Sequence, residues 1–307
     1  MSKLVNIGSL CIDFVYGVPD IVKSGETLAS VQSQIFCGGK GLNQSLAAAR
    51  AGAEVHHLGA IGDDGFALLD TLRAAGVNTD GVLQLEGPSG QAFIQVDPAG
   101  RNAIVISGGS NRRLPASLFD AAVAILEPGD WVLLQNETND VGAAIRRASA
   151  VGAQVALNLA PPDARAADYP INLLALLIVN EPEALALAGG CSWQQAFDTL
   201  IDRYPATSLV LTRGHKGLRY YDAATKEVAQ MDAFNVNAVD ETAAGDAFVG
   251  YLLAGLVQNR DIKQTLRCAS AAGALAVTVS GAAPAIPKRV DVDALLSTQS
   301  ALDWVKM

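Results

Sequence analysis

Short apolar runs alternate with amphipathic segments along most of the chain. From Leu114 onward the apolar runs have the length of strands, and the segments between them have a helical period. The predicted helices are Ala116–Leu126, Val141–Ala150, Glu181–Ala188, Trp193–Arg203, Gly245–Val257 and Ile262–Val279, and the predicted strands are Trp131–Leu134, Gln154–Asn158, Leu174–Val179, Ser208–Thr212 and the hairpin pair Leu218–Tyr221 and Glu227–Met231. This alternation predicts an α/β protein with a mostly parallel sheet covered by helices on both faces.

The N-terminal third departs from this alternation. Its predicted strands are Lys3–Gly8 and Val55–Ile61, and its predicted helices are Gln44–Ala51 and Phe66–Ala75. Segments 14–36 and 88–107 have no helical period, and the second contains two alternating runs, Gln91–Asp97 and Asn102–Ser107, as in a β-hairpin. These two segments either form a lid over the site or cap an edge of the sheet. Because no linker or repeat interrupts the pattern, we expect one domain spanning residues 1–307.

Composition narrows the class of protein. Half of the residues are hydrophobic and 17% are charged, which is typical of a globular chain, and no apolar run approaches the length of a membrane span. The N-terminus lacks a basic region and Asp13 interrupts its apolar stretch, so we expect no signal peptide. The four scattered cysteines fit a reducing cytoplasm. The net charge of −9 disfavours nucleic acid as a partner.

Polar clusters follow several of the predicted strands. They are Asp13, Asn158, Asn180–Glu183 and Thr212–Gly217. Since ligands of open α/β sheets bind beyond the carboxyl ends of the strands, these clusters predict one shared crevice. An acidic, Gly/Ala-rich turn ending in Asp246 also runs into a helix whose first N–H groups can bind an anion. Asp246 is either a catalytic acid in that crevice or the N-cap of its helix.

Three motifs resemble the ribokinase/PfkB family of sugar kinases, in matching order across nearly the full length. They are Gly38-Gly-Lys-Gly-Leu-Asn-Gln44, Asn180-x-x-Glu183 and Asp240-x-Thr-Ala-Ala-Gly-Asp246-x-Phe-x-Gly250. Neither a Walker A motif nor a GxGxxG after the first strand is present. The resemblance, which is strongest to ribokinases, implies a three-layer α/β/α fold with a small β lid that is often used for homodimerisation. It also implies transfer of the ATP γ-phosphoryl group to a sugar hydroxyl, with Mg²⁺ and an activating K⁺.

The resemblance assigns a role to each matching residue. Asp246 would be the proton acceptor, and the backbone N–H groups of Ala243, Ala244, Gly245 and Asp246 would form an anion hole. The sugar would be bound by Asp13, Cys11, Gly39, Lys40, Asn43, Glu137 and Asp246, and the nucleotide by Asn180, Thr212, Gly214, Gly217 and Gly245, with Asn158 near the phosphates. Glu183 would act on Mg²⁺ through water, and Asp240, Thr242, Ala276, Val279 and Gly281 would bind the monovalent cation. A helix N-terminus favours an ionised carboxylate, so Asp246 should be a positioned acceptor and a weak base, which a loose phosphoryl-transfer transition state tolerates.

Cys11 and Glu241 depart from the ribokinase pattern. Cys11 stands where ribokinases have Asn, and a thiol cannot replace the donor and acceptor of an amide, so the sugar preference can differ. The alternatives are therefore a kinase for a non-ribose sugar or for a nucleoside, whose base Phe14, Tyr16 or Phe93 would cover. A third alternative is a binding regulator without turnover. Glu241 replaces a residue that is usually small or Thr, and we expect it to be solvated.

Overall fold

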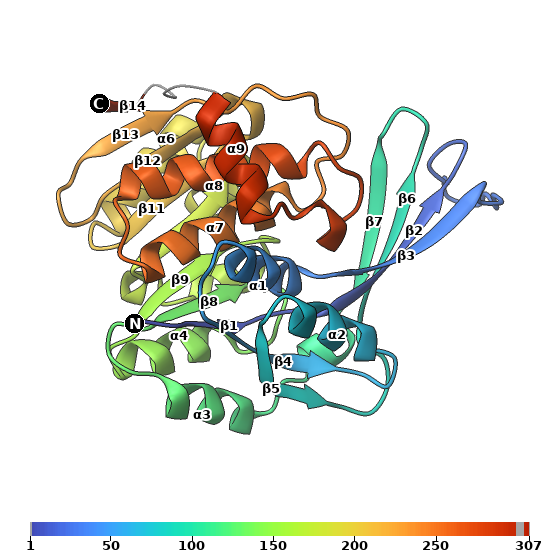
Figure 1. Ribbon diagram of the computed structural model, residues 1–307, viewed down its shortest axis with the longest axis horizontal. Coiled ribbons are helices and arrows are strands. Elements are labelled where there is room, and N and C mark those ends of the chain that lie inside the picture. The colour runs from blue at the N-terminus through green and yellow to red at the C-terminus, as the bar shows by residue number, and fades with distance from the viewer. Residues whose placement is uncertain (1, 299–303, 307) are drawn as a thin grey trace.

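The computed structural model describes residues 2–298 and 304–306. It contains two sheets, which Figure 1 shows as a large body and a projecting arm. The ten-stranded sheet has the order β14-β13-β12-β11-β10-β9-β8-β1-β4-β5, and the four-stranded sheet has the order β3-β2-β6-β7. The neighbours from β11 through β1 to β5 pair in parallel, whereas β11 to β14 pair antiparallel. The predicted α/β class is confirmed.

The bounds of the elements agree closely with the predicted pattern. The strands of the large sheet are β1 (Leu4–Ile7), β4 (Val55–Ile61), β5 (Asn78–Gln84), β8 (Trp131–Gln135), β9 (Gln154–Asn158), β10 (Leu176–Asn180), β11 (Ser208–Thr212), β12 (Leu218–Tyr221), β13 (Val228–Met231) and β14 (Trp304–Lys306). The helices are α1 (Lys40–Arg50), α2 (Phe66–Ala74), α3 (Ala116–Ile125), α4 (Val141–Ala150), α5 (Glu181–Ala188), α6 (Trp193–Arg203), α7 (Ala244–Val257), α8 (Ile262–Ala276) and α9 (Arg289–Thr298). Among the described residues, no helix is long and apolar enough to cross a membrane.

Three differences from the predicted elements have physical reasons. Helix α1 begins at Lys40 and not at Gln44. Glycine has a low helix propensity, so the glycines before Leu42 gave no local signal for the first turn, which tertiary contacts stabilise. Strand β5 was missed, since Gly81 and polar residues interrupt its apolar pattern at the edge of the sheet. Helix α9 was missed as well, because Val292 is its only fully buried residue and its apolar period is therefore weak.

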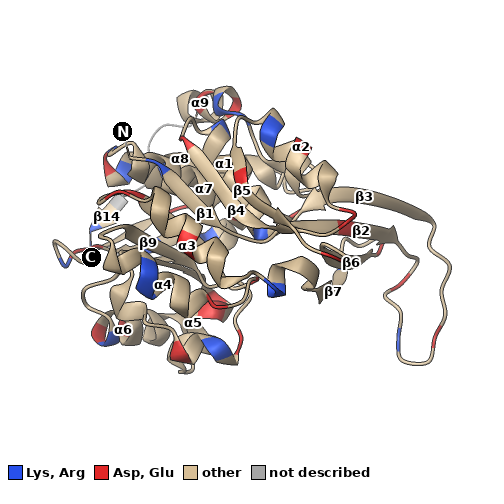
Figure 2. Ribbon diagram, turned by 90° about the horizontal axis from the view of Figure 1, so that it is seen from below, with Lys and Arg blue, Asp and Glu red and all other residues tan. Residues whose placement is uncertain are grey.

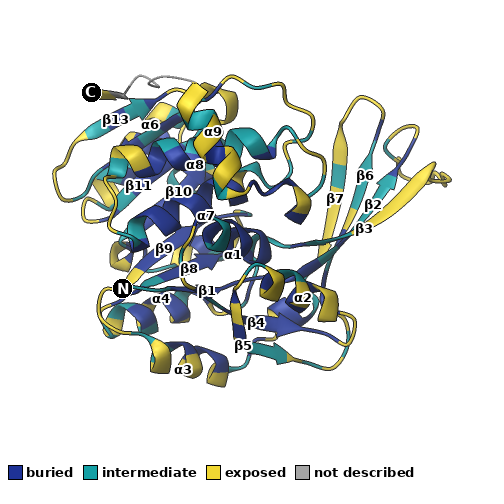
Figure 3. Ribbon diagram, in the orientation of Figure 1, coloured by how far each residue is buried: buried dark blue, intermediate teal, exposed yellow. Residues whose placement is uncertain are grey.

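Two apolar cores cover the two faces of the large sheet. One core includes residues of α1, α2, α7 and α8, and the other includes residues of α3, α4 and α6, while alternate residues of the central strands point into each. Figure 3 shows that burial is concentrated in the central strands and in α1 and α7. Lys and Arg are interspersed with Asp and Glu over the outer helices and loops (Figure 2). The central strands and the helices α1 and α7 therefore form a buried core beneath the site.

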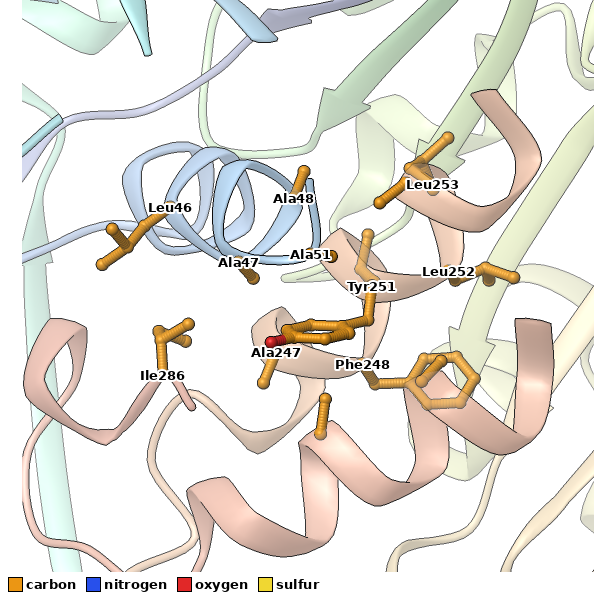
Figure 4. Close-up of a cluster of buried hydrophobic side chains, with 14 of the residues drawn as sticks. Leu46, Ala47, Ala48, Ala51, Ala247, Phe248, Tyr251, Leu252, Leu253 and Ile286 are labelled. Carbon is orange, nitrogen blue, oxygen red and sulfur yellow. The ribbon is translucent and has the colours of Figure 1, made fainter. Parts of the chain in front are cut away.

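Helices α1 and α7 cross at a point without room for a side chain. A Cβ at Gly250 would lie 2.4 Å from Ala47 Cβ and 2.6 Å from the carbonyl oxygen of Gln44. Figure 4 shows Ala47 of α1 and Ala51, the C-cap of that helix, facing Ala247 and Tyr251 of α7 across this crossing. The close approach of the two backbones places the start of α1 beside the start of α7, where two of the family-like motifs lie.

The small sheet consists of β2 (Cys11–Gly17), β3 (Gln32–Gly38), β6 (Gly90–Val96) and β7 (Asn102–Ser107), and it includes parts of both segments that departed from the alternation. Residues paired directly across strands share a face, so Asp13 lies with Phe36 and Ala92, whereas Phe14 and Phe93 lie on the opposite face. The rings of Phe14 and Phe93 stack there with centroids 5.4 Å apart. The face of Asp13 contacts the large body, since the Phe36 ring would lie 3.6 Å from a Cβ at Gly281.

Candidate active site

A pocket of about 230 Å³ lies at the carboxyl ends of β9, β10 and β11, between α1 and α7. Its lining includes Lys40, Asn158, Asn180, Glu183, Thr212, Glu241, Ala243, Gly245 and Asp246. These residues come from five separate stretches of the chain, and they include members of all three motifs. Asp246 and Glu183 are buried, with 7% and 6% of their surface exposed. Of the polar clusters predicted to share one crevice, Asn158, Asn180, Glu183 and Thr212 line this pocket together with Asp246, whereas Asp13 does not.

Asp246 is not the N-cap of its helix. The N-cap of α7 is Ala243, which has a left-handed backbone with φ of 62° and no side-chain cap. Asp246 lies in the first turn, where its carboxylate accepts hydrogen bonds from Asn43 Nδ2 (2.9 Å) and Gln44 Nε2 (2.8 Å). The side chain of Asp246 therefore lies in the pocket lining and is hydrogen-bonded to the motif at the start of α1.

The start of α7 presents its backbone to open space. A Cβ added to Gly245 would meet no atom within 4 Å, and Gly245 lines the pocket. The first N–H groups of a helix have no acceptor inside the helix and carry the positive end of its dipole. An anionic group can therefore approach the backbone of Ala243, Ala244 and Gly245 directly.

The start of α1 depends on a glycine with a left-handed backbone and on a carboxylate from a distant part of the chain. Gly39 has φ of 93°, and a Cβ there would lie 2.9 Å from the backbone nitrogen of Cys11. Since Gly39 offers no side-chain cap, Glu137 Oε2 accepts the N–H of Lys40 at 3.1 Å instead. Ser9 Oγ donates to the same carboxylate and accepts the N–H of Gly41 at 3.1 Å. Glu137 is thereby held beside Lys40.

Four carboxylates surround the Lys40 ammonium. Burial raises the pKa of Asp13 to about 7, and the charges of Glu137 and Asp246 act in the same direction. Burial also raises the pKa of Glu183 to about 7, against the N–H of Asn180 and the charge of Lys40, which lower it. Burial alone would lower the pKa of Lys40, but Asp246, Glu137 and Glu183 outweigh it and raise that pKa. The pocket has an excess of negative charge, which suits cations and hydroxyl donors.

The predicted nucleotide residues divide into two groups. Asn180 and Glu183 form a capping box at the start of α5, in which the Glu183 oxygens accept from Asn180 N and Nδ2, each at 2.9 Å. Together with Thr212 they line the pocket, whereas Gly214 and Gly217 do not. Gly217 is required by its turn, since its φ is 84° and a Cβ would lie 2.0 Å from the carbonyl oxygen of Met231.

Asp240 joins the two segments predicted to bind a monovalent cation. Its oxygens accept the N–H groups of Thr242 and Gly281, each at 2.9 Å. The segment before α7 is thus tied to the segment that follows Ala276 at the end of α8, and Val279 lies in the latter. In the part of the chain that the structure describes, no three His, Cys, Asp or Glu side chains are grouped as a metal site.

Cys11 is buried beside Asp13 at the base of the small sheet. Asn111 Nδ2 donates to its Sγ at 3.4 Å and to the carbonyl oxygen of Leu10 at 2.9 Å. Burial raises the pKa of the Cys11 thiol well above its usual value, and the charges of Glu137 and Asp13 add to the effect. Cys11 therefore remains a neutral thiol with weak hydrogen-bonding capacity.

Sequence reasoning missed four polar residues around the site. Gln44 donates to Asp246, Ser9 holds Glu137, Gln135 donates to Gln44, and Asn111 contacts Cys11. Gln44 stands inside the first motif, and its polar side chain in an Ala/Leu-rich helix was a signal that could have been used. The others depend on contacts between distant segments, for which the sequence alone has no local signal.

We expect Asp13→Asn to stabilise the ligand-free protein at pH 8, by roughly 2 kcal/mol more than at pH 5. The folded pKa of Asp13, about 7, is above its ordinary value of 3.8. Its contribution to stability is therefore complete below about pH 4 and is lost as the pH rises through 7. Urea unfolding at both pH values measures the difference.

Asp130→Asn is the matched control for this experiment. Burial alone would raise the pKa of Asp130, but the N–H groups of Lys3 and Glu127 and the Lys3 ammonium lower it. Asp130 thus stabilises the fold above its unfolded pKa and not below, so its substitution should destabilise the protein at both pH 5 and pH 8. An Asp13→Asn variant with no gain at pH 8 would show that Asp13 is not a strained carboxylate.

Comparisons with known proteins agree with this geometry. A model of the pfkB family carbohydrate kinases matches residues 1–289. A ribokinase of Bacillus subtilis (strain 168) is 35% identical over 302 residues, covering 97% of this chain and 100% of the relative. A deoxyribokinase of Salmonella typhi is 32% identical over 292 residues, covering 92% and 94%. The solved structure of Arabidopsis thaliana ribokinase complexed with ribose and ATP is similar with a TM-score of 0.86 and 26% identity, covering 97% and 100%.

Proposed function

Because this chain belongs to the pfkB family of carbohydrate kinases, we propose that it transfers the γ-phosphoryl group of ATP to a sugar hydroxyl, with Asp246 as the proton acceptor. The match to this family confirms the resemblance predicted from the three motifs. Carbohydrate kinases are phosphotransferases with an alcohol group as acceptor, and the chain is one of them. The observation that carries the residue assignment is the contact of Asp246 with Asn43 at the open N-terminus of α7.

On the sugar side, Asp13 and Asn43 hydrogen-bond hydroxyls, while Lys40, Glu137 and the backbone of Gly39 complete the site. The small sheet serves as a lid, because its Asp13 lies close enough to Glu137, Asp246 and Lys40 for their charges to act on its pKa. On the nucleotide side, the N–H groups of Ala243 to Asp246 stabilise the charge of the transferring group, and the phosphates lie near Asn180, Thr212 and Asn158. The turn that contains Gly214 and Gly217 lies outside the pocket lining and borders the rest of the nucleotide.

Two cations complete the proposed reaction. Mg²⁺, when bound with the nucleotide, neutralises charge on the phosphates, and Glu183 holds its water shell. Glu183 fits this role, since it is buried in the pocket and both its oxygens are oriented by Asn180. K⁺ would be held by the segments of Thr242, Ala276, Val279 and Gly281, which Asp240 joins, and it would support the loop before the anion hole.

We also propose a homodimer formed through the small sheet, in the cytoplasm. Large apolar side chains are exposed on its outer strands and adjoining loop, and Figure 3 shows β3 and β7 as exposed. These side chains are Val31, Ile35, Ile104, Val105 and Ile106. Ile35 and Val105 share a face with Phe14 and Phe93, and exposed apolar side chains on one face favour association with a second surface. Analytical ultracentrifugation of the protein and of an Ile35→Lys/Val105→Lys variant tests the dimer.

Ribose is the first candidate for the sugar, because the relatives that resemble the chain over its whole length include ribokinases. A pentose that lacks a hydroxyl, such as 2-deoxyribose, is the second candidate, and Cys11 favours it. A sugar hydroxyl facing the Cys11 thiol would lose the amide partner that binds it in ribokinases, whereas a hydrogen at that position loses nothing. A nucleoside is not supported, since Phe14 and Phe93 lie on the face of the small sheet opposite Asp13.

A substrate panel tests the activity and the sugar together. We expect ATP-dependent phosphorylation of a pentose, with kcat/KM measured for ribose, 2-deoxyribose, fructose and adenosine, each with and without K⁺. We expect Cys11→Asn to raise the ratio of kcat/KM for ribose to that for 2-deoxyribose by roughly 10-fold or more. An unchanged ratio would mean that Cys11 does not face the distinguishing hydroxyl. Absence of ATP consumption with every sugar would contradict the kinase assignment for this chain.

A further inference from the structure

Asp246 accepts a hydrogen bond from a second side-chain amide, that of Gln44, which is not among the proposed sugar-binding residues. Asn43 Nδ2 donates to Oδ2 of the carboxylate at 2.9 Å, while Gln44 Nε2 donates to Oδ1 at 2.8 Å. Gln44 is fully buried, with 0% of its surface exposed, and it does not line the pocket. Gln44 therefore acts on the substrate only through its acceptors in the pocket, Asp246 and Asn158.

The partners of Gln44 fix the orientation of its amide. Its second Nε2 proton goes to Asn158 Oδ1 at 2.9 Å, and its Oε1 accepts from Gln135 Nε2 at 2.8 Å. In the flipped amide, Oε1 would face the oxygens of Asp246 and Asn158, and Nε2 would face the Gln135 donor. Gln44 can thus present only N–H groups to Asp246.

A buried chain of polar groups holds Gln135 in turn. The second Nε2 proton of Gln135 goes to Asn6 Oδ1 at 2.9 Å, and Asn6 Nδ2 donates to Gly41 O at 2.9 Å and to Ser45 Oγ at 2.8 Å. Ser45 Oγ lies 2.8 Å from His57 Nδ1 and, as an acceptor from Asn6, gives its own proton to that nitrogen. All of these side chains are fully buried.

His57 ends the chain as an acceptor. Burial lowers the pKa of His57 to about 4, so its ring is neutral near pH 7 and Nδ1 can accept from Ser45. Each amide hydrogen of Gln44, Gln135 and Asn6 is then used, and reversing any one of the three amides would place an acceptor against an acceptor. The orientation of Gln44 is therefore set across α1, β8, β1 and β4, far behind the pocket.

We propose that Gln44 is a positioning residue: by donating to Oδ1 while Asn43 donates to Oδ2, it fixes the orientation of the Asp246 carboxylate that receives the proton of the sugar hydroxyl. This inference rests on the proposed kinase function. In the step, the hydroxyl O–H bond breaks as the new O–P bond forms, and the proton moves to the Asp246 carboxylate. The bond from the γ-phosphorus to the bridging oxygen breaks, and ADP leaves with the electron pair. Gln135 and Asn6 act through Gln44.

Gln44→Leu tests the positioning role. We expect kcat to fall roughly 10- to 100-fold, because a carboxylate free to rotate misplaces the accepting oxygen. KM for the sugar should change less than about threefold, since Asp13 and Asn43 remain. Steady-state kinetics with the best sugar of the panel separate the two constants, and thermal unfolding shows that the variant is folded.

Gln44→Glu adds a readout that a merely structural role would not change. A carboxylate at this position lies against Oδ1 of Asp246, and two adjacent carboxylates cannot both be ionised. We expect the acidic limb of the kcat–pH profile to move up by at least about one pH unit, with partial recovery of kcat at pH 9. The charged groups already near Asp246 are Asp13 on β2, Lys40 on α1 and Glu183 on α5, and they are unchanged in this variant.

Gln258→Leu is the matched control. Gln258 is a partly buried glutamine just after α7, and its Nε2 donates to Gly52 O at 2.9 Å, remote from Asp246. Its substitution should leave kcat and the pH profile unchanged. A folded Gln44→Leu variant with kcat within threefold of the wild type, or a Gln44→Glu variant with an unshifted acidic limb, would overturn the inference while the kinase function stands. If the wild type phosphorylates no sugar, it is the proposed function that fails.

Discussion

Asp246→Asn is expected to lower kcat about 10³-fold or more, while the sugar still binds within about tenfold of its wild-type affinity. The amide of Asn cannot take the proton of the attacking hydroxyl. It also has one acceptor oxygen for the two donors, Asn43 and Gln44, that the carboxylate satisfies. Turnover and the dissociation constant of the sugar, from coupled assays and calorimetry, separate the loss of chemistry from a loss of binding.

Asp130→Asn serves as the comparison for this variant too. Asp130 is as buried as Asp246, with 4% and 7% of their surfaces exposed, but it pairs with Lys3 at the start of β1, away from the pocket. Its substitution should lower the free energy of unfolding and leave kcat intact. An Asp246→Asn variant that keeps most of its kcat would remove Asp246 from the role of proton acceptor.

Gly245→Ala should lower kcat/KM for ATP by roughly 10²-fold without destabilising the protein. The new methyl group would occupy the open space in front of the α7 N-terminus, where the proposed transferring phosphoryl group must approach the N–H groups. The same substitution should raise the free energy of unfolding by about 0.4–1 kcal/mol, because Ala loses less backbone entropy than Gly on forming a helix. Loss of activity together with gained stability is not expected from damage to the fold.

Gly142→Ala is the matched control, since Gly142 is the second residue of α4 as Gly245 is of α7. A Cβ at Gly142 would meet Tyr169 at 3.4 Å, an ordinary contact outside the pocket. We expect a similar gain in stability and full activity. Equal activity of the two variants would argue that no phosphate group passes close to Gly245.

The fold was predictable because its central strands and helices bury regular apolar patterns. The predicted bounds of β4, β9, β11, α4, α5 and α6 coincide with those in the structure. The start of α1 was not predictable from local propensity, because its cap comes from Glu137, almost a hundred residues away along the chain, at a distance of 3.1 Å from Lys40 N. Edge and peripheral elements such as β5 and α9 bury too little to leave a clear period.

The motifs of the site could be predicted from the sequence, but the hydrogen bonds that connect its residues could not. The motifs indicated that Asp246, Asn43 and Glu183 would share a crevice, and the pocket lining and the Asn43–Asp246 bond agree. The sequence left open whether Asp246 caps its helix, and the left-handed Ala243 at the N-cap answers that question. The chain from Gln44 to His57 depends on the pairing of β1 with β4 and β8, which no local pattern encodes.

The crossing of α1 and α7 at Gly250 determines when the entropy of ordering Asp246 is lost. Because the two backbones touch there, Asn43 and Gln44 hold both oxygens of Asp246 through the packing of the protein itself. A group oriented in advance needs no reorganisation when charge develops during the reaction. The entropy of ordering the acceptor is therefore lost once, when the chain folds, and not again in each catalytic cycle.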